Sequence, residues 1–192
     1  MNYPKGIKRY NSDNYIRFDN RGMGLEEDIN ITNQYYIDKG IAYIYKKPTP
    51  IQVTKVDYKN NSMTIKEAFF KEPSTTDYNG LYRGLYIDFE AKETTNKTSF
   101  PLANIHKHQI LHIKHVVENG GIGFLIVRFV HLDKNYILMG EDLISFLKEN
   151  DRKSIPYEYF EKKGYLVDIS YNPRLDYLKI IDNILGGKNG KD

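Results

Sequence analysis

The chain has 192 residues and is 40% hydrophobic, which is enough to bury the core of one domain. It contains no cysteine, so disulfide bonds and thiolate metal sites are excluded. The net charge of +3 is mild, no apolar run approaches the length of a membrane span, and the first residues lack an apolar signal sequence. These properties predict an intracellular, cytoplasmic protein.

Residues 1–22 are predicted to form a flexible basic arm. They carry five basic and two acidic side chains, and four aromatic side chains lie between them. Basic and aromatic residues in alternation suit a segment that lies along a phosphate backbone and stacks on bases. The composition fits an ordinary solvated tail equally well.

The first half of the chain predicts one helix and a pair of adjoining strands. Apolar residues at helical spacing predict a helix over 24–38, and Gly40 ends it. A strand is expected over 41–45, and the two prolines of the following KKPTP run break any regular element. Strands over 51–58 and 63–70 flank a short polar turn, a pattern compatible with a projecting hairpin.

The second half predicts a buried sheet with helices around it. A polar loop over 74–80 precedes a strand over 85–92, in which apolar and polar residues alternate. Residues 122–129 are almost all apolar, as in a central strand that is covered on both faces. The other expected elements are a helix over 101–118, a strand over 136–139, a helix over 142–149, a helix from 172 to 185 and a tail over 186–192. The order predicts an α/β fold with a mixed sheet between helices.

Asp77, Glu90 and Lys92 are the candidate catalytic residues. Glu90 and Lys92 lie two positions apart on one strand, so their side chains project from the same face, and a turn can bring Asp77 beside them. Two carboxylates suit a hard Mg²⁺ ion, and a lysine beside that ion can stabilise charge on a phosphate. The pattern is typical of metal-dependent nucleases.

Other interpretations of these residues remain open at this point. A turn aspartate and a solvated strand face explain the spacing of Asp77 and Glu90 without any metal. Asp88 shares the face of Glu90 and competes with Asp77 as the second carboxylate. Glu26 could reach a metal site, but its place in the first turn of a helix favours a role at the helix dipole.

The expected helix over 101–118 contains further polar candidates. Gln109 interrupts an apolar stripe, so it either faces the acidic cluster and binds the metal or makes a core hydrogen bond. His108 and His112 have the spacing of a zinc pair, but the glutamate of an H-E-x-x-H site is absent, which favours a solvated or DNA-facing surface. The chain has no glycine-rich phosphate loop and no G-x-S-x-G motif, so NTPase and serine hydrolase functions are not indicated.

Several distinctive blocks occur in order between about residue 20 and residue 180. They are NRGMGLE from 20, KKPTP from 46, IKEAFF from 65, STTDYNGLYRGLYIDFEAKET from 74, KTSFPLANIHKHQ from 97, KSIP from 153 and PRLDYL from 173. Together these blocks resemble the RecU family of bacterial Holliday junction resolvases.

The resemblance implies a restriction-endonuclease-like core over 23–185, a homodimer, and a stalk over about 48–74 that enters a four-way DNA junction. It implies cleavage that depends on Mg²⁺, for which Mn²⁺ can substitute. The implied metal ligands are Thr75, Asp77, Glu90 and Gln109, and Lys92 becomes the stabiliser of the transition state. Arg21 and Lys46 fall at positions that contact DNA. One departure is the turn at 59–61, which is shorter and less basic than the family pattern.

The expected function is therefore paired, symmetric cleavage of Holliday junctions during recombination and repair, with 5′-phosphate products. The alternative is a DNA-binding protein that anneals strands or modulates a recombinase without cutting. Expected partners are junction DNA and a second copy of the chain, with recombinase and branch-migration proteins as further candidates and no membrane. The expected location is the cytoplasm, in association with the nucleoid.

Overall fold

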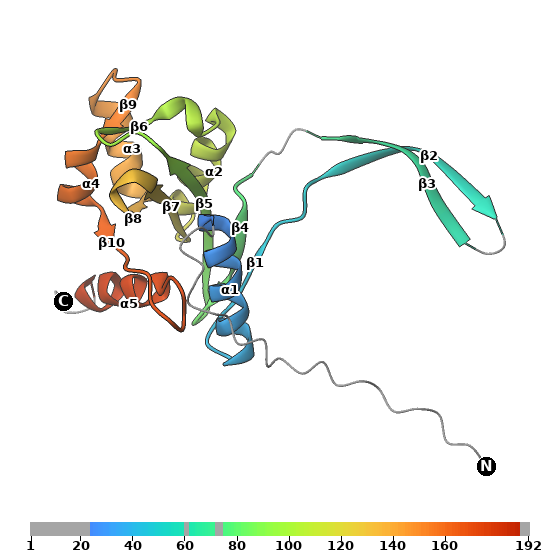
Figure 1. Ribbon diagram of the computed structural model, residues 1–192, viewed down its shortest axis with the longest axis horizontal. Coiled ribbons are helices and arrows are strands. Elements are labelled where there is room, and N and C mark those ends of the chain that lie inside the picture. The colour runs from blue at the N-terminus through green and yellow to red at the C-terminus, as the bar shows by residue number, and fades with distance from the viewer. Residues whose placement is uncertain (1–23, 60–61, 72–74, 189–192) are drawn as a thin grey trace, which may run out of the picture.

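A six-stranded mixed sheet forms the centre of the molecule in a computed structural model that describes residues 24–59, 62–71 and 75–188 (Figure 1). The expected arm over 1–22, including Arg21, lies outside the described residues. Neighbouring strands are antiparallel except β5 and β7, which are parallel. In sheet order the strands are β1 (Tyr43–Lys46), β4 (Tyr78–Tyr82), β5 (Leu85–Thr94), β7 (Ile122–Phe129), β8 (Lys134–Met139) and β10 (Tyr165–Leu166).

Helices cover both faces of this sheet (Figure 1). On one face, α1 (Leu25–Asp38) and α5 (Tyr177–Lys188) pack over the side chains of Phe89 and Phe124. On the other face, α2 (Lys107–Glu118), α3 (Gly140–Glu149) and α4 (Tyr157–Lys163) enclose a second apolar cluster. All eight residues of β7 are buried, as the apolar run predicted. The expected α/β fold with a mixed sheet between helices is confirmed.

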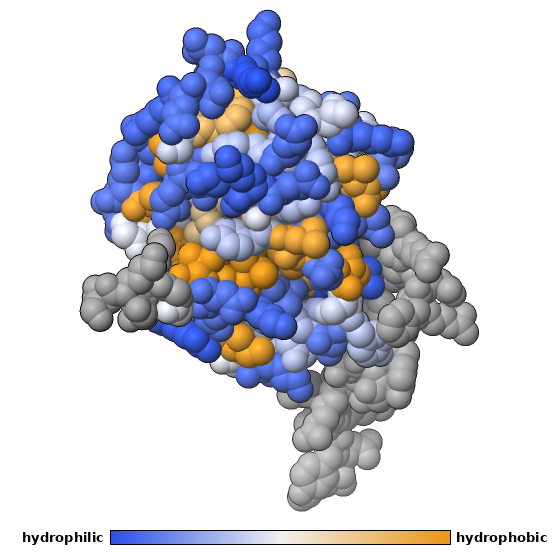
Figure 2. All heavy atoms as spheres, turned by 90° about the vertical axis from the view of Figure 1, so that its left-hand side faces the viewer, coloured by the Kyte–Doolittle hydropathy of each residue, from blue (hydrophilic) through white to orange (hydrophobic). Residues whose placement is uncertain are grey.

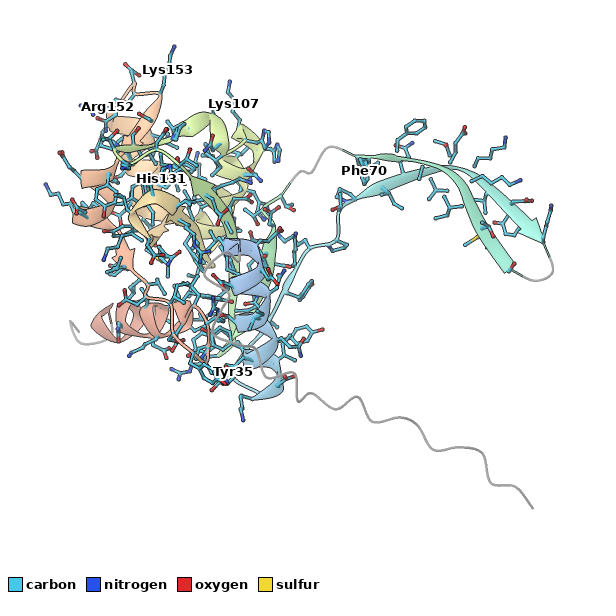
Figure 3. The ribbon with its side chains drawn as sticks, viewed as in Figure 1. Tyr35, Phe70, Lys107, His131, Arg152 and Lys153 are labelled. Atoms are coloured by element: carbon cyan, nitrogen blue, oxygen red, sulfur yellow. The ribbon has the colours of Figure 1, made fainter. Side chains whose placement is uncertain are left out.

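The expected hairpin projects from this core (Figure 1). Its strands, β2 (Ile51–Lys59) and β3 (Ser62–Phe70), pair with each other in a sheet of their own. Every residue of β3 is exposed, and Phe70, at the base of the hairpin, is 81% exposed (Figure 3). An isolated two-stranded hairpin with exposed apolar side chains has no core of its own, so its surface is available to a partner.

Gly80 allows β1 to approach β4 closely. A Cβ atom at this position would lie 2.0 Å from the carbonyl oxygen of Tyr43 and 2.5 Å from Cα of Ile44. Any larger residue would push β1 away from the sheet. The absence of a side chain therefore positions the end of β1, from which the chain enters the hairpin.

Several sequence expectations need correction. The helix expected from residue 101 begins at Lys107, because Phe100 is fully buried in the pairing of β6 (Ser99–Pro101) with β9 (Ser154–Pro156), and a 3-10 turn, η1 (Leu102–Asn104), follows. The polar loop over 74–80 ends in β4, which is held by hydrogen bonds to strands on both sides. The final helix begins at Tyr177 and includes residues 186–188 of the expected tail. Strands β9 and β10 and helix α4 were not expected.

Within the described part of the chain, no helix is long and apolar enough to cross a membrane. The side that carries α4 and α5 is mostly hydrophilic, with a band of apolar side chains across it (Figure 2). An apolar pocket of about 200 Å³ is lined by residues that include Leu85, Ile122, Ile181 and Leu185. None of the candidate site residues lines this pocket.

Candidate active site

The structure brings Asp77, Glu90 and Lys92 together on the sheet face that α2 covers. Asp77 immediately precedes β4, and the antiparallel register of β4 with β5 places Tyr78 opposite Phe89, so Asp77 lies next to Glu90. Lys92 Nζ lies 3.9 Å from Asp77 Oδ2 and forms an ion pair with Glu90 Oε1. One ammonium group therefore contacts both carboxylates. Side-chain alternation along β5 puts Glu90 and Lys92 on one face, and the pairing of β4 with β5 brings Asp77 beside them.

Glu90 is a fully buried carboxylate. Its Oε2 accepts a hydrogen bond from the backbone N–H of Asp77 at 3.0 Å, and its Oε1 is buried against the Lys92 ammonium. Burial and, to a smaller extent, the neighbouring Asp77 carboxyl together raise the pKa of Glu90 from its ordinary 4.5 to about 8, although Lys92 opposes the shift. The site therefore has a deficit of positive charge, which an additional cation would reduce.

The other two expected metal ligands, Thr75 and Gln109, make hydrogen bonds within their own segments. Thr75 is two residues before Asp77, and its hydroxyl donates to the carbonyl of Thr76 at 3.3 Å. Gln109 is 3% exposed in the first turn of α2, and its Oε1 accepts a hydrogen bond from the backbone N–H of His106 at 2.9 Å. Among the described residues, Gln109 makes no hydrogen bond to Asp77 or Glu90. Its visible role is to cap the start of α2.

Of the two expected DNA-contacting residues, the structure describes only Lys46. Lys46 ends β1, and its ammonium forms an ion pair with Glu26 in the first turn of α1. Both side chains are well exposed, so this pair contributes little stability and can be exchanged for a phosphate. Glu26 therefore lies with Lys46 and not with the acidic centre.

Sequence reasoning missed a polar cluster around Asp88. Asp88 is fully buried, and its Oδ2 accepts hydrogen bonds from Lys47 Nζ and from the Tyr86 hydroxyl, each at 2.7 Å. His112 Nε2 lies 3.0 Å from the same oxygen, and the Thr76 hydroxyl contacts Oδ1. One signal for this cluster was visible in the sequence, since Asp88 shares a strand face with Glu90. Lys47, 41 residues away, carried no such signal.

The contacts of His112 and of the pair Asp77 and Glu90 indicate which metal ions the site could hold. His112 Nε2 contacts the Asp88 carboxylate. Within the residues that the structure describes, no group of three or more His, Cys, Asp or Glu side chains is placed to hold a metal. A site with one or two carboxylates is still sufficient for Mg²⁺, which keeps several waters and takes further oxygens from substrate phosphates.

A mixed sheet flanked by helices, with two carboxylates and a lysine clustered on one face, is the arrangement expected of a metal-dependent nuclease. The family model of RecU, described as Recombination protein U, matches residues 20–183. The Holliday junction resolvase RecU of Geobacillus kaustophilus is 50% identical over 194 residues, covering 96% of this chain and 97% of that protein. The RecU of Pediococcus pentosaceus is 56% identical over 169 residues, covering 86% and 84%. The chain belongs to the RecU family.

A solved structure was also found among the similar proteins. It is the Holliday junction resolvase Hjc of Archaeoglobus fulgidus, with a TM-score of 0.42 and 9% sequence identity. The similarity covers 73% of this chain and 92% of that one.

Proposed function

We propose that this protein is a Mg²⁺-dependent endonuclease that resolves four-way DNA junctions by paired, symmetric cleavage. The observation that carries the proposal is the contact of Lys92 with both Asp77 and Glu90 on one face of β5. A protein that only binds DNA has no need for two carboxylates around a lysine, one of them fully buried. Membership of the RecU family, whose curated relatives are named Holliday junction resolvases, supports the choice of substrate.

The residues present fit a Mg²⁺ ion, with Mn²⁺ as a substitute. Asp77 and Glu90 supply carboxylate oxygens, and Thr75 and Gln109 supply neutral oxygens from the adjoining segment and from α2. The buried Glu90 oxygens and the raised pKa of this carboxyl support a site that accepts an added cation. Bound there, Mg²⁺ supplies Lewis acidity and neutralises negative charge at the phosphate.

The side chains of this centre act on the phosphodiester as follows. Asp77 and Glu90 would orient the scissile phosphate through the cation that they hold, because carboxylates alone repel a phosphate. A water attacks phosphorus in line with the 3′ oxygen and gives up one proton to the solvent. The bond between phosphorus and the 3′ oxygen breaks, which leaves a 5′-phosphate and, after protonation, a 3′-hydroxyl. Lys92 stabilises the negative charge that builds up on the phosphate oxygens.

The proposal extends to the assembly and its location. A homodimer places two such sites on one junction, and its two-fold symmetry matches the near two-fold symmetry of that DNA. Lys46, Arg21 and the exposed hairpin contact the DNA. Lys107, Arg152 and Lys153 point outward at one end of the molecule, where they can meet the DNA arms (Figure 3). Such an enzyme works in the cytoplasm at the nucleoid, where recombinase and branch-migration proteins are its expected partners.

The decisive experiment compares a mobile four-way junction with linear duplex, with and without Mg²⁺. We expect symmetric cuts in the junction, little cutting of the duplex and none without the metal. Asp77→Asn and Glu90→Gln should retain junction affinity within about threefold and lose cutting by at least a hundredfold. Equal rates on both DNAs would refute selectivity for junctions. Binding by the wild type without cutting in Mg²⁺ or Mn²⁺ would support the alternative of a non-cleaving, strand-annealing protein.

A further inference from the structure

The cluster around Asp88 lies beside the proposed metal site, and the reaction described above does not use it. Asp88 and Glu90 are two positions apart on β5 and project from the same face. Four side chains surround the Asp88 carboxylate, and two of them, Lys47 and Tyr86, donate to it at 2.7 Å. A buried carboxylate with this many partners is held in one orientation, because losing a partner would leave it unsatisfied.

Lys47 connects this cluster to the segment that carries Asp77. The Lys47 ammonium donates to Thr76 Oγ1 at 3.0 Å as well as to Asp88. The Lys47 backbone N–H donates to the carbonyl of Asp77 at 2.7 Å. The Thr76 hydroxyl also contacts Asp88. The residues Thr76 and Asp77 are therefore held by Lys47 through both a side chain and the main chain.

The same segment is bonded to Glu90. The backbone N–H of Asp77 donates to Glu90 Oε2 at 3.0 Å, so the peptide groups on either side of Asp77 are fixed from two directions. A rotation of the chain at Thr76 would break this bond and would turn the Asp77 carboxylate away from Lys92. The geometry of the carboxylate pair thus depends on contacts that Lys47 makes.

The position of Lys47 in the chain links these contacts to the hairpin. Lys47 directly follows β1, and the next residues, 48–50, lead into β2. The two ends of the hairpin meet at its root, where the N–H of Lys71 donates to the carbonyl of Pro50 at 2.9 Å. A pocket at this root is lined by Lys46, Lys47 and residues 75–77 among others. A shift of the root therefore moves residues that adjoin Asp77.

We propose that Lys47 is a positioning residue, which holds Asp77 in register with Glu90 and couples that geometry to the root of the hairpin. The inference rests on the proposed nuclease function of the same site. The side chain of Lys47 is 18% exposed and its ammonium is engaged by Asp88 and Thr76, whereas the neighbouring Lys46 is 43% exposed. Two adjacent lysines thus have different roles: Lys46 faces the DNA, and Lys47 organises the site.

The test compares Lys47→Met with Lys47→Arg and with the matched surface change Lys148→Met on α3. Junction affinity is measured in Ca²⁺, and single-turnover cutting is measured at saturating protein over a series of Mg²⁺ concentrations. For Lys47→Met we expect affinity within about threefold of wild type, at least a tenfold slower cut and a higher Mg²⁺ concentration for half-maximal rate. Lys47→Arg should recover most of the rate, and Lys148→Met should match wild type.

Two results would overturn the role of Lys47. A folded Lys47→Met variant that cuts at the wild-type rate would remove it from the mechanism. A parallel loss of affinity and rate with an unchanged Mg²⁺ requirement would make Lys47 a DNA contact. If Lys47→Met does not fold, Thr76→Val provides a second test. It removes the hydrogen bond between Lys47 and Thr76 with little change in volume, and it must show the same slower cut and higher Mg²⁺ requirement.

A measurement without DNA separates this inference from the proposed function. Hydrogen exchange of the Asp77 amide reports the bond to Glu90 directly. In Lys47→Met this amide should exchange at least tenfold faster than in wild type, while the amides of β7 keep their protection. Unchanged exchange at Asp77 would refute the positioning role even if the cutting rate fell. If the wild type fails to cut with Mg²⁺, the proposed function is wrong, and the exchange comparison still tests the contact network.

Discussion

At the scale of single residues, Glu90 shows how burial sets the properties of the site. The side chain is removed from water, its neighbour Asp77 also carries a negative charge, and Lys92 is the cation in contact with it. In the folded chain the ionised form is therefore disfavoured, which is the physical reason for a pKa of about 8. Such a cost is consistent with the cation-binding role proposed for Glu90.

The raised pKa predicts a pH dependence of stability. The folded chain keeps a proton on Glu90 up to about pH 8, whereas the unfolded chain loses it near 4.5. The free energy of unfolding of the metal-free protein should therefore fall as the pH rises between these values, by a few kcal/mol at most, at about 1.4 kcal/mol per unit. Glu90→Gln should lack this fall. Urea unfolding with a chelator at pH 5.5 and 8.5 measures the difference, and parallel pH profiles would contradict it.

Gln109 offers a second prediction at this scale. In the structure its side chain caps the start of α2, whereas the resemblance to RecU implies that it is a metal ligand. Gln109→Leu removes the acceptor for the N–H of His106 and should cost about 1 kcal/mol of stability. If Gln109 also binds Mg²⁺, the concentration needed for half-maximal cutting should rise severalfold. Gln109→Glu keeps an oxygen at both positions and should preserve the cap and the metal requirement. If the Mg²⁺ concentration for half-maximal cutting is unchanged in Gln109→Leu, Gln109 is not a metal ligand and its role is limited to capping α2.

At the scale of elements, the hairpin and the sheet are distinct structural units. Strands β2 and β3 pair only with each other in the described part of the chain, and their ends meet at Lys71 and Pro50. Asp57 pairs with Lys66 at 2.8 Å and lies 3.9 Å from Lys59, so part of the positive charge of the hairpin is neutralised internally. This arrangement suits recognition of DNA shape more than simple attraction to phosphates.

Removal of the hairpin should therefore separate folding from substrate choice. Replacement of residues 51–70 by two glycines joins chain ends that already lie together, so the thermal midpoint should change by only a few degrees. The preference for a four-way junction over linear duplex should disappear, while Mg²⁺-dependent nicking persists at a low rate. A variant that still prefers the junction tenfold or more would show that the core alone recognises it. Circular dichroism and cutting assays on both DNAs make the measurement.

At the scale of the whole molecule, two opposed cuts require two sites. The chain has one cluster of the Asp77, Glu90 and Lys92 kind in its described residues, and a single site would have to release and rebind the junction between cuts. We therefore predict a homodimer in solution. Sedimentation should give about twice the 22.5 kDa of the chain, and it should do so at the protein concentrations at which cutting is measured. A monomer that makes both cuts in one encounter would contradict this.

The sequence by itself determined the features that depend on local pattern. Alternation over 85–92 predicted which side chains of β5 share a face, and the apolar run of β7 predicted its burial on both faces. The hairpin strands were predicted nearly to their observed bounds. Each of these features follows from the two-residue period of a strand or from a turn between two strands. The resemblance to RecU, confirmed by the family match, added the choice of Asp77 over Asp88.

Only the tertiary structure decided which polar groups of distant segments bond to one another. Strand β4 contains Asn79 and Gly80, which favour turns, and it is a strand because β1 and β5 bond to it on both sides. Helix α2 begins at Lys107, and not at residue 101 as expected, because Phe100 is buried in the pairing of β6 with β9. The short-range sequence pattern did not reveal β9. The contacts of Lys47 with Asp88 and with Asp77 join parts of the chain about 30 to 40 residues apart. Such contacts depend on the packing of the whole sheet, and no local periodicity encodes them.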